Sequence, residues 1–163
     1  MQMEKRIMKY ANVSQIIFKN KQNIPWNEVE QYLKRYIGES FVVKEYGDVI
    51  HVAGEFPDEF TESQYTKKLR GGLAKAKANA GQVIGEMIEN AQNRRWIENK
   101  DEKYEKEASG GWYRYDVAFT IPIDDAGTMR RNVYQATAVV RIKKDKLFLY
   151  DIINIKKEAS TPL

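Results

Sequence analysis

The stretch GGWYRYDVAFTIPI, residues 110–123, decides the fold, because apolar and polar residues alternate along most of it with a period of two. Such alternation is typical of a β-strand with one buried face and one open face. The odd-numbered positions from 113 onward are aromatic or aliphatic and predict the buried face. The even-numbered positions include Arg114, Asp116 and Thr120, and predict the open face.

Two further strand-like runs, residues 132–143 and 146–155, follow the turns DDAGT and KKDK. Connections this short join antiparallel neighbours, so the three runs predict an antiparallel meander. Helical patterns lie earlier in the chain, and helices first with strands last favour an α+β fold. We therefore predict N-terminal helices packed on a C-terminal antiparallel sheet, a meander of three to four strands.

Two segments before these strands have helical periodicity. Apolar residues at helical spacing predict one helix over residues 27–37, with Asn27 as its N-cap and Gly38 as its stop. A longer helix is predicted over residues 73–91, because its apolar residues form a stripe that can pack on the sheet.

Three shorter elements are predicted around these helices. Residues 40–46 and 48–53 predict a β-hairpin. The proline and acids of FPDEF predict a short helix that begins at Pro57 or Asp58. The mostly charged residues 92–109 predict a short edge strand or helix followed by a connector.

The predicted helix over residues 73–91 carries two lysines in the run AKAKA. A rotation of about 100° per residue places Lys77 at the edge of the apolar stripe and Lys75 nearly opposite. Lys75 is therefore expected to be solvated, whereas Lys77 is expected either to extend from the helix edge into solvent or to take part in chemistry. The helix also has a flank of small residues: Ala74, Ala78, Gly81 and Gly85.

The composition limits the class of protein. The 163 residues suffice for one domain with a core of its own. The longest aliphatic runs fall well short of the roughly 18 residues that a membrane span needs. The charged start MQMEKRIMKY lacks the pattern of a signal peptide. We predict a single cytoplasmic domain that makes no membrane contact.

Residue counts exclude several chemistries as well. There is no cysteine, which excludes disulfides and thiolate metal sites, and the single His51 excludes a multi-histidine metal site. The net charge of +4 and the pI near 9.1 permit a nucleic-acid partner without requiring one. We predict no metal or other cofactor.

The predicted open face of the sheet combines cations, hydrogen-bonding groups and aromatic rings. Its members are Trp112, Arg114, Asp116, Thr120, Gln135, Thr137, Arg141, Phe148 and Tyr150. Cations that hold phosphates and aromatics that stack on bases are typical of RNA-binding sheets. A purely solvated face has polar residues too, and the periodicity leaves both interpretations open.

Several runs resemble a known group of domains: FPDEF, AKAKANA, IGEMIENA, GGWYRYDVAFTIPI and LYDIINIKKEASTPL. They are similar to domains in large polyvalent proteins of phages and conjugative elements, which resemble the barnase, EndoU, colicin and RelE-like nuclease superfamily. The resemblance spans about residues 55–163, so residues 1–54 are expected to form a helix and hairpin extension of one domain.

The resemblance implies metal-independent RNA cleavage, in which a ribose 2′-hydroxyl attacks the adjacent phosphate. His51 lies outside the similar segment, which disfavours a histidine mechanism. RelE-type members use lysine, arginine and tyrosine, and this likeness predicts Arg114 and Arg141 as phosphate cations and Lys77 or Tyr150 as proton carriers.

Substrate-binding roles are predicted for Trp112, Thr120, Gln135 and Thr137. Asp151 interrupts the apolar pattern of its strand, which predicts either a β-bulge or a buried partner for an arginine or a helix N-terminus. Asp116 is the predicted partner of Arg141.

Three functions follow as hypotheses. The first is a ribonuclease, a toxin or effector module of a mobile element. The second is the same kind of domain without turnover, which binds RNA or a protein such as an immunity or carrier protein. The third is a small-molecule pocket on the small-residue flank of the helix over residues 73–91.

Overall fold

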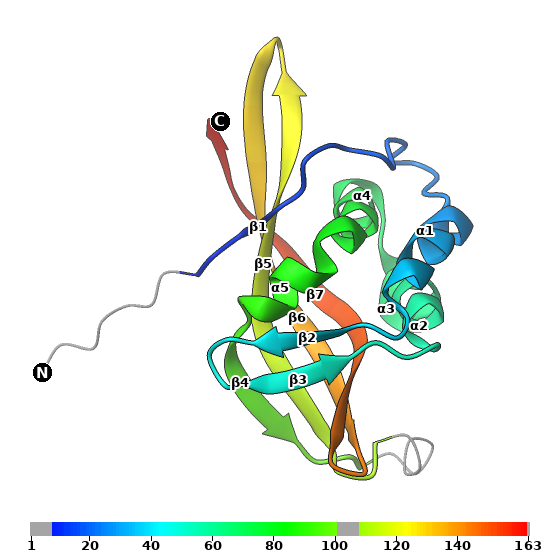
Figure 1. The fold of residues 1–163 in the computed structure, drawn as a ribbon. Helices are drawn as coiled ribbons and strands as arrows, with labels where there is room; N and C mark the ends of the chain where they lie inside the picture. The colour runs from blue at the N-terminus through cyan, green and yellow to red at the C-terminus, as the bar shows by residue number, and fades with distance from the viewer. Residues whose placement is uncertain (1–7, 101–107, 163) are drawn as a thin grey trace, which may run out of the picture.

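The computed structural model describes residues 8–100 and 108–162 (Figure 1). The helical elements are α1 Trp26–Leu33, the 3-10 turn η1 Lys34–Tyr36, α2 Phe56–Glu62, α3 Gln64–Lys68, α4 Gly71–Ala80, the 3-10 turn η2 Gly81–Val83 and α5 Ile84–Glu89. The strands are β1 Ala11–Asn12, β2 Ser40–Val43, β3 Asp48–His51, β4 Gln92–Ile97, β5 Trp112–Asp125, β6 Thr128–Lys143 and β7 Lys146–Pro162.

The described strands form one mixed, seven-stranded sheet that curls around the helices (Figure 1). Its order is β1-β5-β6-β7-β3-β2, with β4 also paired to β5, and the pairs β1/β5 and β3/β7 are parallel. The fold is α+β, but the prediction of N-terminal helices on an antiparallel sheet of three to four strands is wrong. The helices lie in the middle of the chain, and short strands from the N-terminal half cover the edges of β5 and β7.

The central meander is longer and less regular than predicted. β5 and β6 pair continuously from Trp112 to Asp125, and β7 extends to Pro162. The register of β6 and β7 shifts at three places, one of them between Val139 and Val140. Val139 faces Asp151 and Val140 faces Leu149, so the residue between these two β7 positions has no partner of its own in β6.

The predicted helix over residues 73–91 is divided at Gly81 into α4, η2 and α5. α1 approaches closely here, because a Cβ at Gly81 would lie 3.0 Å from Leu33 Cδ2. The Tyr36 hydroxyl also donates a hydrogen bond of 2.6 Å to the Gly81 carbonyl. The helix therefore turns where α1 and η1 pack against it.

α1 itself begins at Trp26 after Pro25 and makes no side-chain N-cap bond, so the prediction of Asn27 as the N-cap is wrong. The short helix at Pro57 is confirmed, with the proline in the first turn of α2. Residues 92–97 form the edge strand β4, one of the two forms predicted.

The core lies between the helices and the inner face of the sheet. It includes Leu33, Phe56, Phe60, Ile84, Tyr115, Val117, Phe119, Leu149 and Ile152. The odd-numbered face of β5 is thus confirmed as the core face. No helix among residues 8–100 and 108–162 is long and apolar enough to cross a membrane.

Candidate functional site

Three of the predicted site residues come together in one cleft. Trp112, Arg114 and Tyr150 line a cavity of about 740 Å³ between the sheet, the α2–α3 junction and the end of β4. The rings of Trp112 and Tyr150 meet edge to face, with centroids 5.0 Å apart and planes at 74°. Tyr150 is the unpaired residue of the β-bulge in β7, and its ring lies on the same side of the sheet as Trp112.

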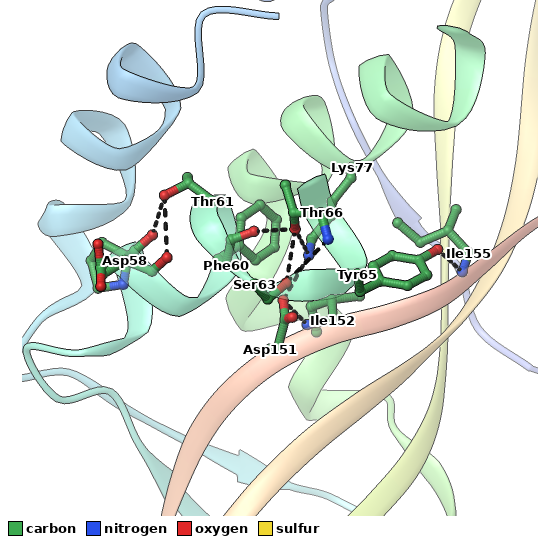
Figure 2. Close-up of polar contacts among 11 residues, drawn as sticks. Asp58, Phe60, Thr61, Ser63, Tyr65, Thr66, Lys77, Asp151, Ile152 and Ile155 are labelled. Atoms are coloured by element: carbon green, nitrogen blue, oxygen red, sulfur yellow. Dashed lines mark hydrogen bonds and ion pairs between the residues drawn. The ribbon is translucent and has the colours of Figure 1, made fainter. Parts of the chain in front are cut away.

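Lys77 lies inside the protein beside Ser63 and Asp151 (Figure 2), two residues that line the cleft. Its Nζ is 2.7 Å from Asp151 Oδ1, and the two side chains are 0% and 4% exposed. The same ammonium donates to Thr66 Oγ1 at 2.5 Å, and the Thr66 hydroxyl donates to the Phe60 carbonyl at 2.7 Å. This buried cluster joins α3, α4 and β7.

Burial acts on both charges of the pair. It raises the pKa of Asp151 and lowers that of Lys77, and the attraction between the two opposes both shifts. The Ser63 side chain hydrogen-bonds to Asp151 and accepts from the Thr66 amide as the N-cap of α3. Lys77 therefore holds elements together, and its charge does not reach the solvent in the cleft.

Arg141 is also neutralised within the protein. Its guanidinium binds the Glu55 carboxylate, with Nε and Nη2 at 2.6 and 2.5 Å from Oε1, and it lies 4.3 Å from the centroid of the Phe148 ring. Arg141 faces Trp112 across β5 and β6, but it does not line the cleft. The prediction of Asp116 as its partner is wrong, because Asp116 binds Arg95 at 3.0 Å.

The predicted catalytic residues are thus separated. Arg114 and Tyr150 share the cleft, Lys77 is paired beneath it, and Arg141 is paired beside it. His51 lies against Phe148, with ring centroids 5.7 Å apart, on the far side of Arg141.

The predicted substrate-binding residues other than Trp112 lie outside the cleft. Thr120 is 4% exposed and donates to Asn12 Oδ1 at 2.6 Å, because β1 covers that end of β5. Thr137 is 9% exposed and faces Asp116. Gln135 is half-buried opposite Lys156. β1 therefore covers one end of the β5 face that was predicted to be open.

The charge of the cleft does not suit a polyanion. Its lining contains two cations, Arg114 and Lys100, and four carboxylates: Glu59, Glu62, Glu98 and Asp151. Asp151 is neutralised by Lys77, so the cations do not outnumber the other acids among the lining residues that the structure describes. An RNA phosphate would meet repulsion here from these acids.

A second region, which we call the basic groove, has the opposite balance. Two cavities of about 490 and 520 Å³ flank the start of α4 and share Gly72, Tyr134 and Lys157 as lining residues. The charged residues of the basic groove are five cations and one carboxylate: Lys21, Arg70, Lys75, Lys156, Lys157 and Asp124.

These cations are not neutralised by ion pairs. Within residues 8–100 and 108–162, none of the five lies within salt-bridge distance of a carboxylate. Arg70 Nη1 donates to the backbone carbonyls of Lys67 and Leu69, which carry no net charge. Lys75 is half-buried, and burial together with the nearby positive Lys21 lowers its pKa.

Sequence reasoning missed the basic groove. The signals were the short basic runs KNK at 19–21, KKLR at 67–70 and KK at 156–157, each too weak to interpret alone. They meet only because the loop before α1, the α3–α4 junction and the end of β7 come to one place in the fold.

Searches of protein-family models, of curated proteins and of solved structures find no match for this chain. In the part of the chain that the structure describes, no group of three or more His, Cys, Asp or Glu residues could hold a metal ion.

Proposed function

We propose that this protein binds RNA without cleaving it and holds the RNA backbone along the basic groove. One observation carries the proposal: five cations and a single carboxylate line the two adjoining cavities at the start of α4. Clustered lysines and arginines attract the phosphate backbone and release its counterions, which drives binding. The resemblance to RNA-cleaving domains favours RNA over other polyanions.

The geometry favours binding over turnover. A metal-independent ribonuclease needs a free cation beside the reacting phosphate and a group that transfers protons. Lys77 and Arg141, two of the four predicted catalytic residues, are each held by an internal carboxylate. Arg114 and Tyr150 lie in the cleft whose lining is acidic.

The binding test compares two double variants of equal charge. Lys156→Gln/Lys157→Gln removes two cations from the basic groove, and Lys143→Gln/Lys146→Gln removes a cross-strand pair at the β6–β7 turn. Anisotropy of a labelled single-stranded RNA should show about tenfold weaker binding for the first variant only. Its plot of log affinity against log salt should lose a slope of about 1.4, since each phosphate contact contributes about 0.7. Equal loss in both variants, or no binding by the native protein, would contradict the proposal.

The turnover test incubates the same RNA with the native protein in EDTA. We expect the RNA to remain intact over hours. If the native protein cleaves the RNA and Arg114→Ala does not, the protein is an enzyme and its active site lies in the cleft.

A further inference from the structure

The first of the two groove cavities, of about 490 Å³, combines an apolar wall with lysines that come from distant parts of the chain. It lies between the loop before α1, the first turns of α4, and β5 and β6. Its volume falls in the range of small-ligand sites. Its apolar lining consists of Ile16, Ala76, Ile121, Pro122 and Ile123.

Three lysines and one carboxylate, Asp124, line the same cavity, and two of the lysines are those that the proposal uses. Lys21 comes from the loop before α1, and Lys75 from α4. Burial lowers the pKa of Lys75, and the nearby positive charge of Lys21 lowers it further. A phosphate dianion between the two ammonium groups would relieve this repulsion better than a singly charged phosphodiester.

The apolar wall is held rigidly in place. Tyr134, which lines both cavities, stacks on Phe119 with centroids 5.2 Å apart and planes at 14°. Ile121 belongs to the buried core and is 3% exposed. A flat, apolar nucleobase can lie against such a surface without ordering mobile side chains.

We propose that this cavity binds the terminal nucleotide of an RNA strand, with the terminal phosphate between Lys21 and Lys75 and the base against Ile121–Ile123. The inference rests on the proposed RNA binding and adds recognition of the strand end. The rest of the strand leaves past Gly72, Tyr134 and Lys157 into the second cavity, where Arg70 and Lys156 meet its next phosphates.

The test uses one labelled ten-nucleotide RNA in three forms: with a 5′-phosphate, with a 3′-phosphate, and with hydroxyls at both ends. One phosphorylated form should bind the full chain about tenfold more tightly than the hydroxyl form, and the choice of 5′ or 3′ identifies the end that enters. Lys75→Gln and Lys21→Gln should each remove this preference, whereas Lys143→Gln should keep it.

A steric variant checks the same cavity without changing charge. Gly72 lines the cavity, and a Cβ built on it meets no atom within 4 Å, so Gly72→Val should fold normally while narrowing the cavity. It should abolish the preference for a phosphorylated end. Thermal unfolding of each variant confirms that the fold is retained, and Lys21→Gln, in an exposed loop, is the variant least coupled to folding.

The outcomes separate this inference from the proposed function. If all three RNAs bind equally well, recognition of the end is wrong but RNA binding stands. A preference that survives in both Lys21→Gln and Gly72→Val also overturns the inference, because the end would then be bound elsewhere. If none of the RNAs binds, the proposed function fails.

Discussion

Lys75 and Lys77 lie two residues apart on α4, yet the fold uses their charges in opposite ways. Lys77 is fully buried and held by Asp151 at 2.7 Å. Lys75 is half-buried beside Lys21, has no ion pair among the described residues, and has a lowered pKa. A lysine that completes an internal ion pair supports the folded state, because it neutralises a buried carboxylate. A lysine beside another cation destabilises the folded state until an anion binds between the two.

The same contrast separates the cleft from the basic groove. Around the cleft, Lys77 and Arg141 are neutralised by Asp151 and Glu55, and the described lining has four carboxylates and two cations. In the basic groove the cations outnumber the carboxylates five to one. The number of cations near a site is therefore less informative than the number that have no carboxylate partner.

The largest effect is expected from breaking the buried pair. Lys77→Met leaves Asp151 buried without its partner, which should lower the free energy of unfolding by about 3–5 kcal/mol in urea denaturation. Lys77→Met/Asp151→Leu should recover most of that loss, because it removes both charges. A loss below about 1 kcal/mol in Lys77→Met would show that Lys77 is not structural and would reopen its catalytic role.

The second prediction concerns Arg141. Glu55→Gln removes the carboxylate that binds the guanidinium, and since Arg141 is only 8% exposed the unfolding free energy should fall by about 1–2 kcal/mol. RNA binding should be unchanged and no cleavage should appear. If Glu55→Gln cleaves RNA, Arg141 is a catalytic cation held inactive by Glu55, and the contrast between cleft and groove fails.

The periodicity of the sequence correctly predicted the features that depend only on residues close to one another in the chain. The alternation in GGWYRYDVAFTIPI correctly predicted the buried face, as Tyr115, Val117 and Phe119 show. The two-residue strand β1 was missed because it is too short to have a period. β3 was anticipated as a hairpin arm, but its parallel pairing with β7 depends on a long-range contact.

The candidate site was harder to predict because it depends on contacts between residues that are far apart in the sequence. Asp151 lies next to the bulge at Tyr150, and its partner Lys77 is 74 residues away in the sequence, so only the packing of α4 on β7 shows the pair. The helical rotation correctly predicted that Lys75 and Lys77 point in different directions. It also predicted that Lys75 is solvated, whereas the structure shows it half-buried. The role of Lys75 depends on Lys21, which is 54 residues away in the sequence.

A third prediction uses pH to test Lys75 in RNA binding. Since its pKa is lowered, Lys75 loses its charge at a lower pH than an ordinary lysine, so affinity for the preferred phosphorylated RNA should fall several-fold as the pH rises through that pKa. Lys75→Arg stays charged throughout and should hold its affinity over the same range. Parallel pH profiles for the two proteins would show that Lys75 does not contact the RNA.

The smallest expected effect is on stability. Lys75→Gln removes a half-buried charge and its repulsion from Lys21, and it should raise the unfolding free energy at neutral pH by a few tenths of a kcal/mol, because the solvent still screens much of that charge. The sign follows from the lowered pKa: the folded state disfavours charged Lys75, so the destabilisation is complete below the folded pKa and disappears as the pH passes the higher, unfolded value. The native protein and Lys75→Gln should therefore differ in urea midpoint at pH 7 and converge at alkaline pH. A variant that is less stable than the native protein at pH 7 would show that Lys75, like Lys77, supports the fold, and the contrast between the two lysines would be lost.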